Sequence, residues 1–411
     1  MLKPGILTKN ILWNTVGNIF YLGCLWLLSV FVVRLSHSYV DAGILSLSMS
    51  VTNIFSMLAL FSIRNYQVSD LEDKYSQADY IAHRLITCSA AFVLCIVFVL
   101  LNGYSAAITL SITAYMLFKA IESLADVFHG ILQRKWRFEL IGRSYIYRGF
   151  TLLITFTLIY KLFGQLWIAL LSMAVLTTLV FTLYDWRQVC RFTEISFRTS
   201  WEKIVNLTRD CLPLMLYSLL LASITSTARF FIERYHGEEA LGYYGSIATI
   251  AVIVQSTVSL IFTPLNGLLS DSYARGDHRA IVRLSARVLL LLTAVTGVAM
   301  LAARLLGRFV LVLLFGEDIA PYVWLLYPTI LASCLTGLVW YLAMLLTIMR
   351  SMKSLVIGAT AGFTVCLALS LTVIPQSACH GANLATIVAL VVLSAVYAVA
   401  AHRKIRPNRG P

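Results

Sequence analysis

One predicted helix carries ionisable side chains where a membrane-spanning segment normally has none. Polar residues recur there at intervals of three or four positions: Tyr115, Lys119, Glu122, Asp126, His129 and Gln133. On an α-helix this spacing places them on one face, within an arc of about 80°. A charge that faces lipid at the centre of a span costs about 2.5–3.5 kcal/mol. We therefore expect this polar face to contact protein or a water-filled cavity.

The same face also has a structural interpretation. Lys119 and Glu122 are spaced i,i+3 and can pair with each other, while Asp126 and His129 can lie in the inner headgroup region. The sequence alone leaves both interpretations open.

Other embedded charges raise the same choice. Arg148, near the inner end of the segment 144–162, either faces the interior or extends to the headgroups. Arg229 either contacts a ligand or pairs with Glu233 at i,i+4. Gly358 and Gly362 form a GxxxG pattern, which indicates close packing against another helix.

No motif for catalysis or metal binding accompanies these residues. The eight cysteines form no CxxC, the seven histidines form no HExxH, and neither GxxxxGK[ST] nor GxSxG occurs. We therefore expect neither an enzyme nor a metal site, and no cofactor.

The composition shows which elements position these side chains. Of the 411 residues, 59% are hydrophobic and 12% are charged, whereas soluble proteins have about 25% charged residues. This excludes a soluble enzyme and a disordered chain. Spanning segments must be helical, because lipid offers the backbone no hydrogen-bond partners. Twelve apolar runs are long enough to span: 11–33, 40–63, 85–102, 106–128, 144–162, 165–184, 211–232, 243–266, 288–304, 322–347, 354–374 and 383–401.

The positive charges predict the orientation. With both termini in the cytoplasm, 25 of the 32 Lys and Arg residues lie in cytoplasmic segments or at cytoplasmic ends of spans, and five lie outside. The net charge of +13 then faces an anionic inner leaflet, and we expect no nucleic-acid partner. The expected location is the cell (plasma or inner) membrane, crossed many times.

The two halves of the chain resemble each other. Ser69-Asp70 follows the second predicted span, and Ser270-Asp271 follows the eighth. Six spans in each half give a parallel repeat, in which binding sites lie between the halves near mid-membrane. We expect an N-lobe at 1–208 with the linker, a C-lobe at 209–411, and a monomer.

Four blocks carry a resemblance to a known family. They are RNYQVSDLEDKYSQADYIAHRLIT (64–87), DVFHGILQRKWRFELIGRSYIYRG (126–149), RFFIERYHGEEALGYYGSIATIAVIVQS (229–256) and LLFGEDIAPYVWLLYP (313–328). The chain resembles the polysaccharide-type (Wzx-like) flippases of the multidrug/oligosaccharidyl-lipid/polysaccharide exporter superfamily. That resemblance implies two six-helix lobes around a central cationic cavity. It also implies transfer of a polyprenyl-diphosphate-linked oligosaccharide to the outer leaflet by alternating access, for surface polysaccharide biosynthesis.

The resemblance also implies functional arginines at the outer end of the first span and within the second, for which Arg34 and Arg64 are the candidates, with Asp41 beside Arg34. The hypothesis is a flippase in which cations hold the diphosphate and acids tune their charge or carry a coupling ion. The cationic candidates are Arg34, Arg64, Lys119, Arg148 and Arg229, and the acidic candidates are Asp41, Glu122 and Asp126.

Two alternatives stay open. A multidrug or cation antiporter of the same superfamily would use Glu122 or Asp126 for cation exchange, although the lysine and arginines argue against it. A non-transporting anchor for a glycan synthesis complex has no need of polar helix faces. The expected partners are a lipid-linked oligosaccharide and the bilayer, with other glycan-assembly membrane proteins as potential partners.

Overall fold

A computed structural model describes residues 4–36, 38–70 and 72–405, and every regular element in these ranges is a helix. Side chains are described from residue 9 onward, apart from 37, 71 and 256–264. The chain forms two compact units, Met1–Ala222 and Ser223–Pro411. The predicted lobe boundary at 208/209 lies somewhat earlier in the sequence.

The helices have the lengths that a membrane requires. Within the described residues, eleven helical stretches are long and apolar enough to span a bilayer. One of them, at 201–255, contains Gly237, whose φ of 82° and ψ of 176° interrupt the helix. This stretch therefore includes the predicted span 211–232 and the first part of 243–266. The all-α polytopic membrane fold is confirmed, while the cytoplasmic location of the termini stays a prediction.

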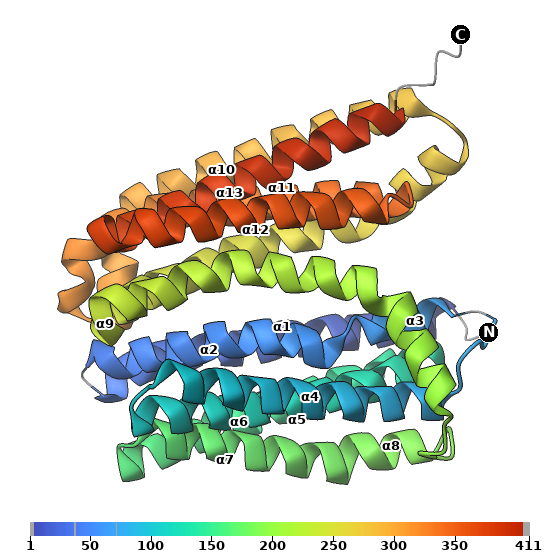
Figure 1. The fold of residues 1–411 in the computed structure, drawn as a ribbon, viewed down its shortest axis with the longest axis horizontal. Helices are drawn as coiled ribbons and strands as arrows, with labels where there is room; N and C mark the ends of the chain where they lie inside the picture. The colour runs from blue at the N-terminus through green and yellow to red at the C-terminus, as the bar shows by residue number, and fades with distance from the viewer. Residues whose placement is uncertain (1–3, 37, 71, 406–411) are drawn as a thin grey trace. The chain divides into compact units, whose positions relative to one another are not determined.

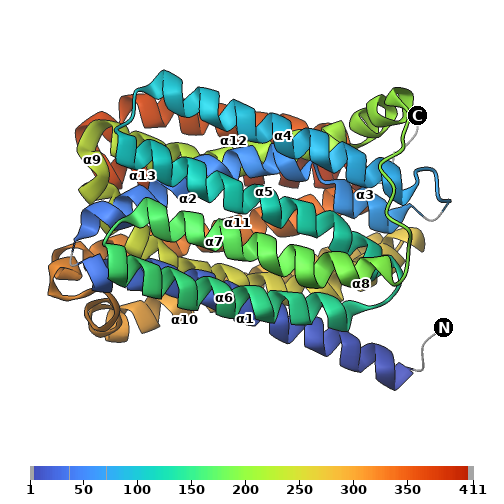
Figure 2. The same ribbon diagram turned by 90° about the horizontal axis from the view of Figure 1, so that it is seen from below.

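The N-terminal unit is a bundle of helices, and an extended connection at 191–200 joins α8 to α9 (Figures 1 and 2). Its elements are α1 (Pro4–Ser36), α2 (Tyr39–Leu60), α3 (Ile63–Ser69), α4 (Gln77–Asn102), α5 (Ala106–Arg134), α6 (Phe138–Phe163), α7 (Leu166–Val180), the π-helix η1 (Phe181–Trp186), α8 (Arg187–Cys190) and the first part of α9 (Trp201–Ala274). Helix α5 packs against α2, α3, α4, α6, α7 and η1, so its polar face lies inside the bundle.

Local sequence signals set the ends of these helices. Ser76 and Asp79 form a reciprocal capping box at the start of α4, and the hydroxyl of Ser105 accepts a hydrogen bond from a backbone N–H at the start of α5. Between them, Gly103 ends α4 with a φ of 65°, a conformation in which a side chain would be strained. These signals produce the tight turn that makes α4 and α5 antiparallel neighbours.

Helix α2 ends two residues before α3 begins, and neither intervening residue is a glycine or a proline. Phe61 and Ser62 both adopt left-handed backbone angles, with φ of 46° and 54°. Each such residue costs about 1–2 kcal/mol relative to a right-handed one. The break leaves the carbonyl oxygen of Ala59 free for side chains, and it accepts hydrogen bonds from Arg84 Nη1 and Thr87 Oγ1, both at 2.9 Å.

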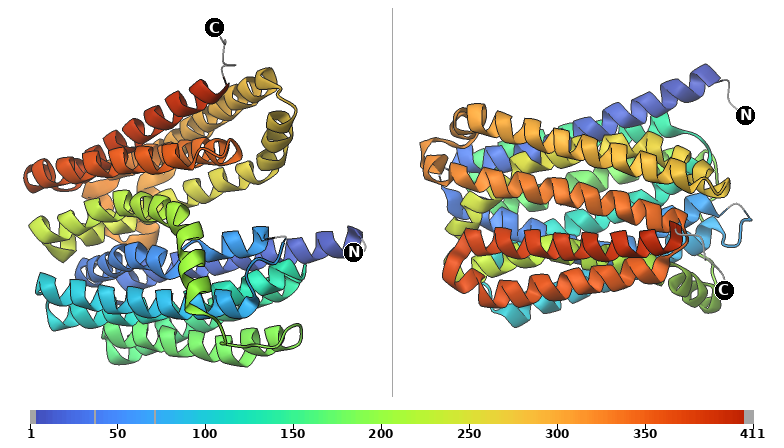
Figure 3. Two further views of the ribbon diagram at one scale, coloured as in Figure 1. Left: turned by 45° about the vertical axis from the view of Figure 1, so that its right-hand side comes forward. Right: turned by 90° about the horizontal axis from the view of Figure 1, so that it is seen from above.

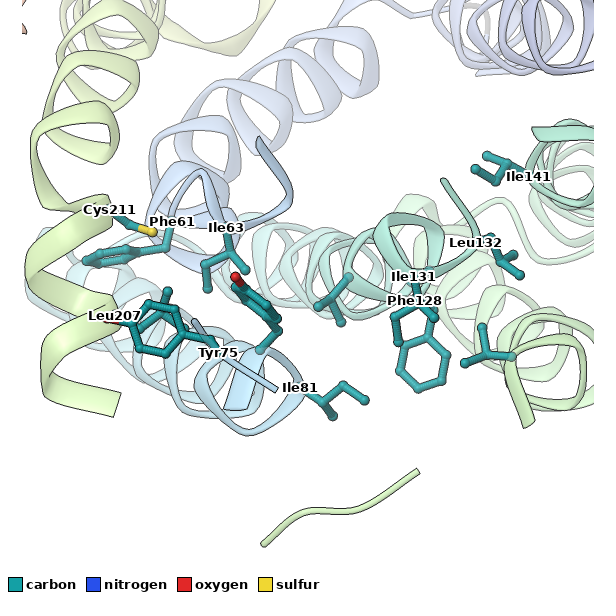
Figure 4. Close-up of a cluster of buried hydrophobic side chains, with 14 of the residues drawn as sticks. Phe61, Ile63, Tyr75, Ile81, Phe128, Ile131, Leu132, Ile141, Leu207 and Cys211 are labelled. Atoms are coloured by element: carbon teal, nitrogen blue, oxygen red, sulfur yellow. The ribbon is translucent and has the colours of Figure 1, made fainter. Parts of the chain in front are cut away.

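A buried apolar cluster surrounds this break (Figure 4). Phe61 and Ile63 from the break, Phe128 from α5, and Leu207 and Cys211 from α9 belong to one group of buried side chains. Close packing of such side chains stabilises helix contacts through many small dispersion attractions. The cluster therefore helps to offset the strain of two left-handed residues and holds α3 against α5.

The C-terminal unit is also helical (Figure 3). It contains the remainder of α9, α10 (His278–Phe315), the 3₁₀ helix η2 (Glu317–Leu325), α11 (Leu326–Ile348), α12 (Met352–Thr372) and α13 (Ile374–Ile405). Helices α12 and α13 pack closely, as the GxxxG pattern predicts. A Cβ atom on Gly358 would lie 2.4 Å from the ring of Tyr397, and one on Gly362 would lie 3.1 Å from Cβ of Leu393.

Helices α1 and α6 approach each other through glycine. A Cβ atom on Gly17 would lie 2.2 Å from the backbone oxygen of Gly142, and one on Gly142 would lie 2.3 Å from that of Trp13. Backbone atoms cannot move away as a flexible side chain can. The crossing of α1 and α6 therefore requires glycine at 17 and 142.

We predict that Gly17→Ala lowers the free energy of unfolding by about 1–3 kcal/mol, because the new methyl group forces two backbones apart. Gly23→Ala on the same helix is the matched control. Nothing lies within 4 Å of its added Cβ, and alanine favours a helix over glycine by up to about 1 kcal/mol. Thermal unfolding of the purified proteins measures both, and equal midpoints for the two variants would contradict the prediction.

Candidate functional site

Two adjoining cavities lie within the N-terminal unit. The larger has a volume of about 390 Å³ and the smaller about 280 Å³, and Met57, Leu60 and Asp126 line both. Polar and charged residues also line the larger one: Ser62, Arg64, Asn65, Gln133 and Ser218. The smaller one is lined by aromatic, amide, hydroxyl and charged side chains, among them Asn18, Tyr21, Asn53, Ser56, Lys119, Glu122, Ser123, His129, Tyr145 and Arg148.

Asp126 is the carboxylate shared by the two cavities, and it is held by two arginines. Its Oδ1 lies 2.9 Å from Arg64 Nη1, and its Oδ2 lies 3.0 Å from Arg84 Nη2. Arg64 also donates to Gln133 Oε1 from Nε (3.2 Å) and Nη2 (2.9 Å). The side chain of Arg84 is fully buried, whereas those of Arg64 and Asp126 are 23% and 22% exposed. Arg84 is therefore closed off from the cavities, whereas Arg64 and Asp126 face them.

A second carboxylate lies one turn earlier on α5. Lys119 Nζ lies 2.7 Å from Glu122 Oε2, and the other carboxylate oxygen accepts a hydrogen bond from the Tyr21 hydroxyl on α1. Lys119 and Glu122 are 25% and 18% exposed, while Tyr21 is buried. The ring of Tyr21 stacks on that of Tyr145 from α6, with centroids 5.6 Å apart.

A third carboxylate, Asp185, is completely buried. It forms an ion pair with Arg148 through Oδ2, and its Oδ1 lies 3.2 Å from His129 Nε2, which also lies 3.3 Å from Ser144 Oγ. Asp185 belongs to the π-helix η1, whose wider turn changes the direction of its side chains. The π-helix aims this carboxylate at α5 and α6.

The loop after α3 anchors the helix that carries Arg64. The Asp70 carboxylate accepts hydrogen bonds from Tyr80 (2.8 Å) and from the backbone N–H groups of Lys74 (3.1 Å) and Tyr75 (3.2 Å). Burial raises the pKa of Asp70, but these hydrogen bonds and the charge of Arg134 outweigh it and leave the pKa below its ordinary value. Asp70 is therefore ionised at neutral pH, and it ties α3 to the start of α4.

The structure brings five of the predicted site residues together: Arg64, Lys119, Glu122, Asp126 and Arg148 all line these cavities. Both interpretations of the polar face of α5 hold at once, because Lys119 and Glu122 pair while they line a cavity. The placement of Asp126 and His129 at headgroup depth stays a prediction. The extension of Arg148 to the headgroups is wrong, because its side chain is only 3% exposed and pairs with Asp185.

Three predicted residues lie elsewhere. Arg34 is exposed in the last turn of α1, and Asp41, in the first turn of α2, accepts a hydrogen bond of 2.5 Å from Tyr160. At 1.5 Å per residue, Asp41 is roughly 24 Å along α2 from the cavity residue Met57. Arg229 belongs to the C-terminal unit, and within the described residues it forms no ion pair with Glu233, so that predicted pair is wrong.

Sequence reasoning missed Arg84 and Asp185 as site residues. Arg84 lies one residue before the predicted span 85–102, although α4 begins at Gln77 and encloses it. Asp185 lies one residue past the predicted end of the span 165–184. Both lie just outside the predicted spans, and both depend on partners that are distant in sequence, Asp126 for Arg84 and Arg148 for Asp185.

The chemistry of the site is recognition of charge. Guanidinium and ammonium groups bind phosphate and carboxylate strongly, and the cavities add amide and hydroxyl donors. Within the described residues, no group of three or more His, Cys, Asp or Glu is arranged to hold a metal ion.

We predict that Asp185→Asn destabilises the protein by about 3–5 kcal/mol, because Arg148 is left as an uncompensated buried charge. In the exposed i,i+4 pair of Asp271 and Arg275, by contrast, Asp271→Asn is expected to cost about 0–1 kcal/mol. Thermal unfolding in detergent compares them. A small effect at Asp185 would mean that Arg148 has another compensating group.

The fold is that of known transporters. The chain matches an inward-facing multidrug resistance MATE family transporter of the MOP superfamily with a TM-score of 0.74 and 12% identity, covering 95% of this chain and 94% of the other. It matches lipid II flippase MurJ, in an inward closed conformation, with a TM-score of 0.76 and 12% identity, covering 96% and 89%. At such identities the likeness establishes the fold alone.

Sequence comparison gives the family. A curated relative, capsular polysaccharide biosynthesis protein CapF from Staphylococcus aureus, is 25% identical over 317 residues, which are 76% of this chain and 78% of the relative. The family model described as polysaccharide biosynthesis protein matches residues 7–265, more than half of the chain. This protein therefore belongs to the polysaccharide biosynthesis protein family and is a multi-pass membrane protein with the fold of MOP-superfamily transporters.

Proposed function

We propose that this protein is a flippase that moves a polyprenyl-diphosphate-linked oligosaccharide from the inner to the outer leaflet by alternating access. The observation that carries the proposal is the pair of cavity-facing cations, Arg64 and Lys119, inside a membrane bundle. Ionisable groups among spans are costly, and they mark the pathway of a substrate that needs them. A diphosphate is a substrate of that kind.

The two cations offer different contacts to such a head group. Arg64 presents a planar fork of N–H donors suited to phosphate oxygens, and Lys119 supplies a compact charge. Asn18 and Asn53 in the smaller cavity and Asn65 in the larger one add amide groups, which suit sugar hydroxyls. In this proposal the prenyl chain stays in lipid while the polar head crosses through the protein.

The family supports the role in polysaccharide biosynthesis. CapF is named for capsular polysaccharide biosynthesis, and MurJ is named as a lipid II flippase. By extension, we propose that this chain serves the export of a surface polysaccharide and acts as a transporter, not as a catalyst. It works as a monomer in this proposal, with the bilayer and the lipid-linked oligosaccharide as its partners.

A multidrug or cation antiporter is the second candidate. It is favoured by the likeness to a MATE transporter and by two carboxylates, Glu122 and Asp126, on the cavity walls. Against it, each of these carboxylates is already paired with a cation of the protein. A positively charged drug would have to compete with those built-in cations.

We predict that the purified protein flips a labelled polyprenyl-diphosphate oligosaccharide in proteoliposomes, followed by the accessibility of the label to an outside quencher. Arg64→Ala and Lys119→Ala are each expected to lower the rate about tenfold or more, since hydrogen bonds to charged groups contribute about 1.5–3 kcal/mol. Arg275→Ala, in an exposed ion pair, is the control and is expected to retain the wild-type rate.

Each other result has a definite meaning. Wild-type rates in both cavity variants would place the head group elsewhere. If the wild type moves no such lipid but exchanges a small organic cation, the protein is an antiporter and the flippase proposal is wrong.

A further inference from the structure

The two cavity-facing carboxylates share one arrangement. Each holds a cation that is about a quarter exposed on the cavity wall and a second donor that is buried. Asp126 joins Arg64, 23% exposed, to Arg84, fully buried. Glu122 joins Lys119, 25% exposed, to the hydroxyl of Tyr21, whose side chain is 4% exposed. In each case the partly exposed cation has room to turn into the cavity, whereas the buried donor does not.

The third carboxylate differs in this respect. The side chains of both partners of Asp185, Arg148 and His129, are at most 3% exposed, so this group has no exposed cation that can change partner. The combination of one partly exposed cation and one buried donor therefore occurs at Asp126 and Glu122, on the cavity wall, and not at Asp185.

We propose that Asp126 and Glu122 are internal counter-ions. They pair with Arg64 and Lys119 before the substrate binds, and they release these cations to the anionic head group of the substrate when it enters. Arg64 and Lys119 change partner from carboxylate to phosphate, while Arg84 and Tyr21 keep the released carboxylates in place. This inference rests on the proposed flippase function and deepens it, because it assigns a role to both acids and to Arg84.

The energetics favour such an exchange. Replacement of one anion by another at Arg64 leaves the guanidinium paired throughout, so the exchange creates no uncompensated charge there. Loss of the only partner of a buried charge is strongly unfavourable, but Asp126 has a second partner. When Arg64 turns away, Asp126 still neutralises Arg84, and no buried charge is left alone.

The exchange also assists release. After the head group leaves, the carboxylates are already beside the cations and compete for them at high effective concentration. A site without these carboxylates would hold its anion more tightly and let it go more slowly. Affinity and transport rate should then change in opposite directions, which a merely structural role would not produce.

The test measures both quantities on the full chain. We expect Asp126→Asn and Glu122→Gln to bind inorganic pyrophosphate about fivefold to tenfold more tightly than the wild type in titration calorimetry, a ratio that corresponds to about 1 kcal/mol. The same variants should flip the lipid-linked oligosaccharide several-fold more slowly. Glu122→Gln keeps an acceptor for Tyr21, so it tests the proposal even if Asp126→Asn fails to fold.

Asp271→Asn is the matched control, because it removes one carboxylate from an exposed ion pair. It should leave pyrophosphate affinity and flipping unchanged. Weaker or unchanged pyrophosphate binding in both cavity variants would overturn the counter-ion proposal while leaving the flippase intact, provided that the wild type still flips. A wild type that flips but does not bind pyrophosphate would also overturn it. A wild type that neither flips nor binds would remove the proposed function itself.

Discussion

A charge enclosed by membrane-spanning helices needs an opposite charge or several polar partners, and the N-terminal unit is arranged around that constraint. Arg84 is fully buried, and its two terminal nitrogens are paired, Nη2 with Asp126 and Nη1 with the carbonyl oxygen of Ala59. That carbonyl is available because α2 ends at Leu60, before two left-handed residues. The chain then re-enters a helix and brings Arg64 to the other oxygen of Asp126. One carboxylate thus links α3, α4 and α5.

The resulting interior is nearly balanced in charge. Four cations, Arg64, Arg84, Lys119 and Arg148, meet three carboxylates in the described cluster around the cavities. In the proposed flippase, recognition of an anion there depends on the direction of particular N–H groups more than on a strong positive field. This suits a transporter, because a site with a large excess of positive charge would bind a diphosphate too firmly to release it. It also explains why net charge alone is a poor guide to the substrate of a polytopic protein.

Sequence patterns and the family resemblance predicted most of this fold and five of the seven charged residues in the cluster around the cavities. The apolar runs and the 3–4-residue spacing on α5 depend only on helix geometry, so the spans, Lys119, Glu122 and Asp126 could be found from them. The break at Phe61–Ser62 could not, since neither residue is a glycine, asparagine or aspartate, the types that favour left-handed backbone angles, and the strain is offset by tertiary packing. Arg84 and Asp185 were missed because their role depends on partners far away in sequence. Arg34 and Asp41, taken from family resemblance, lie away from the cluster within the same unit.

The π-helical turn at 181–186 makes this part of the chain sensitive to length. A π turn holds one residue more than an α turn, and each residue of a regular helix rotates the next by about 100°. Deleting one residue here would restore a regular α-helix and rotate the Asp185 carboxylate away from Arg148 and His129. In an alignment of relatives, a one-residue gap at this turn would therefore signal the loss of a buried charge contact, whereas most substitutions around it would leave that contact in place.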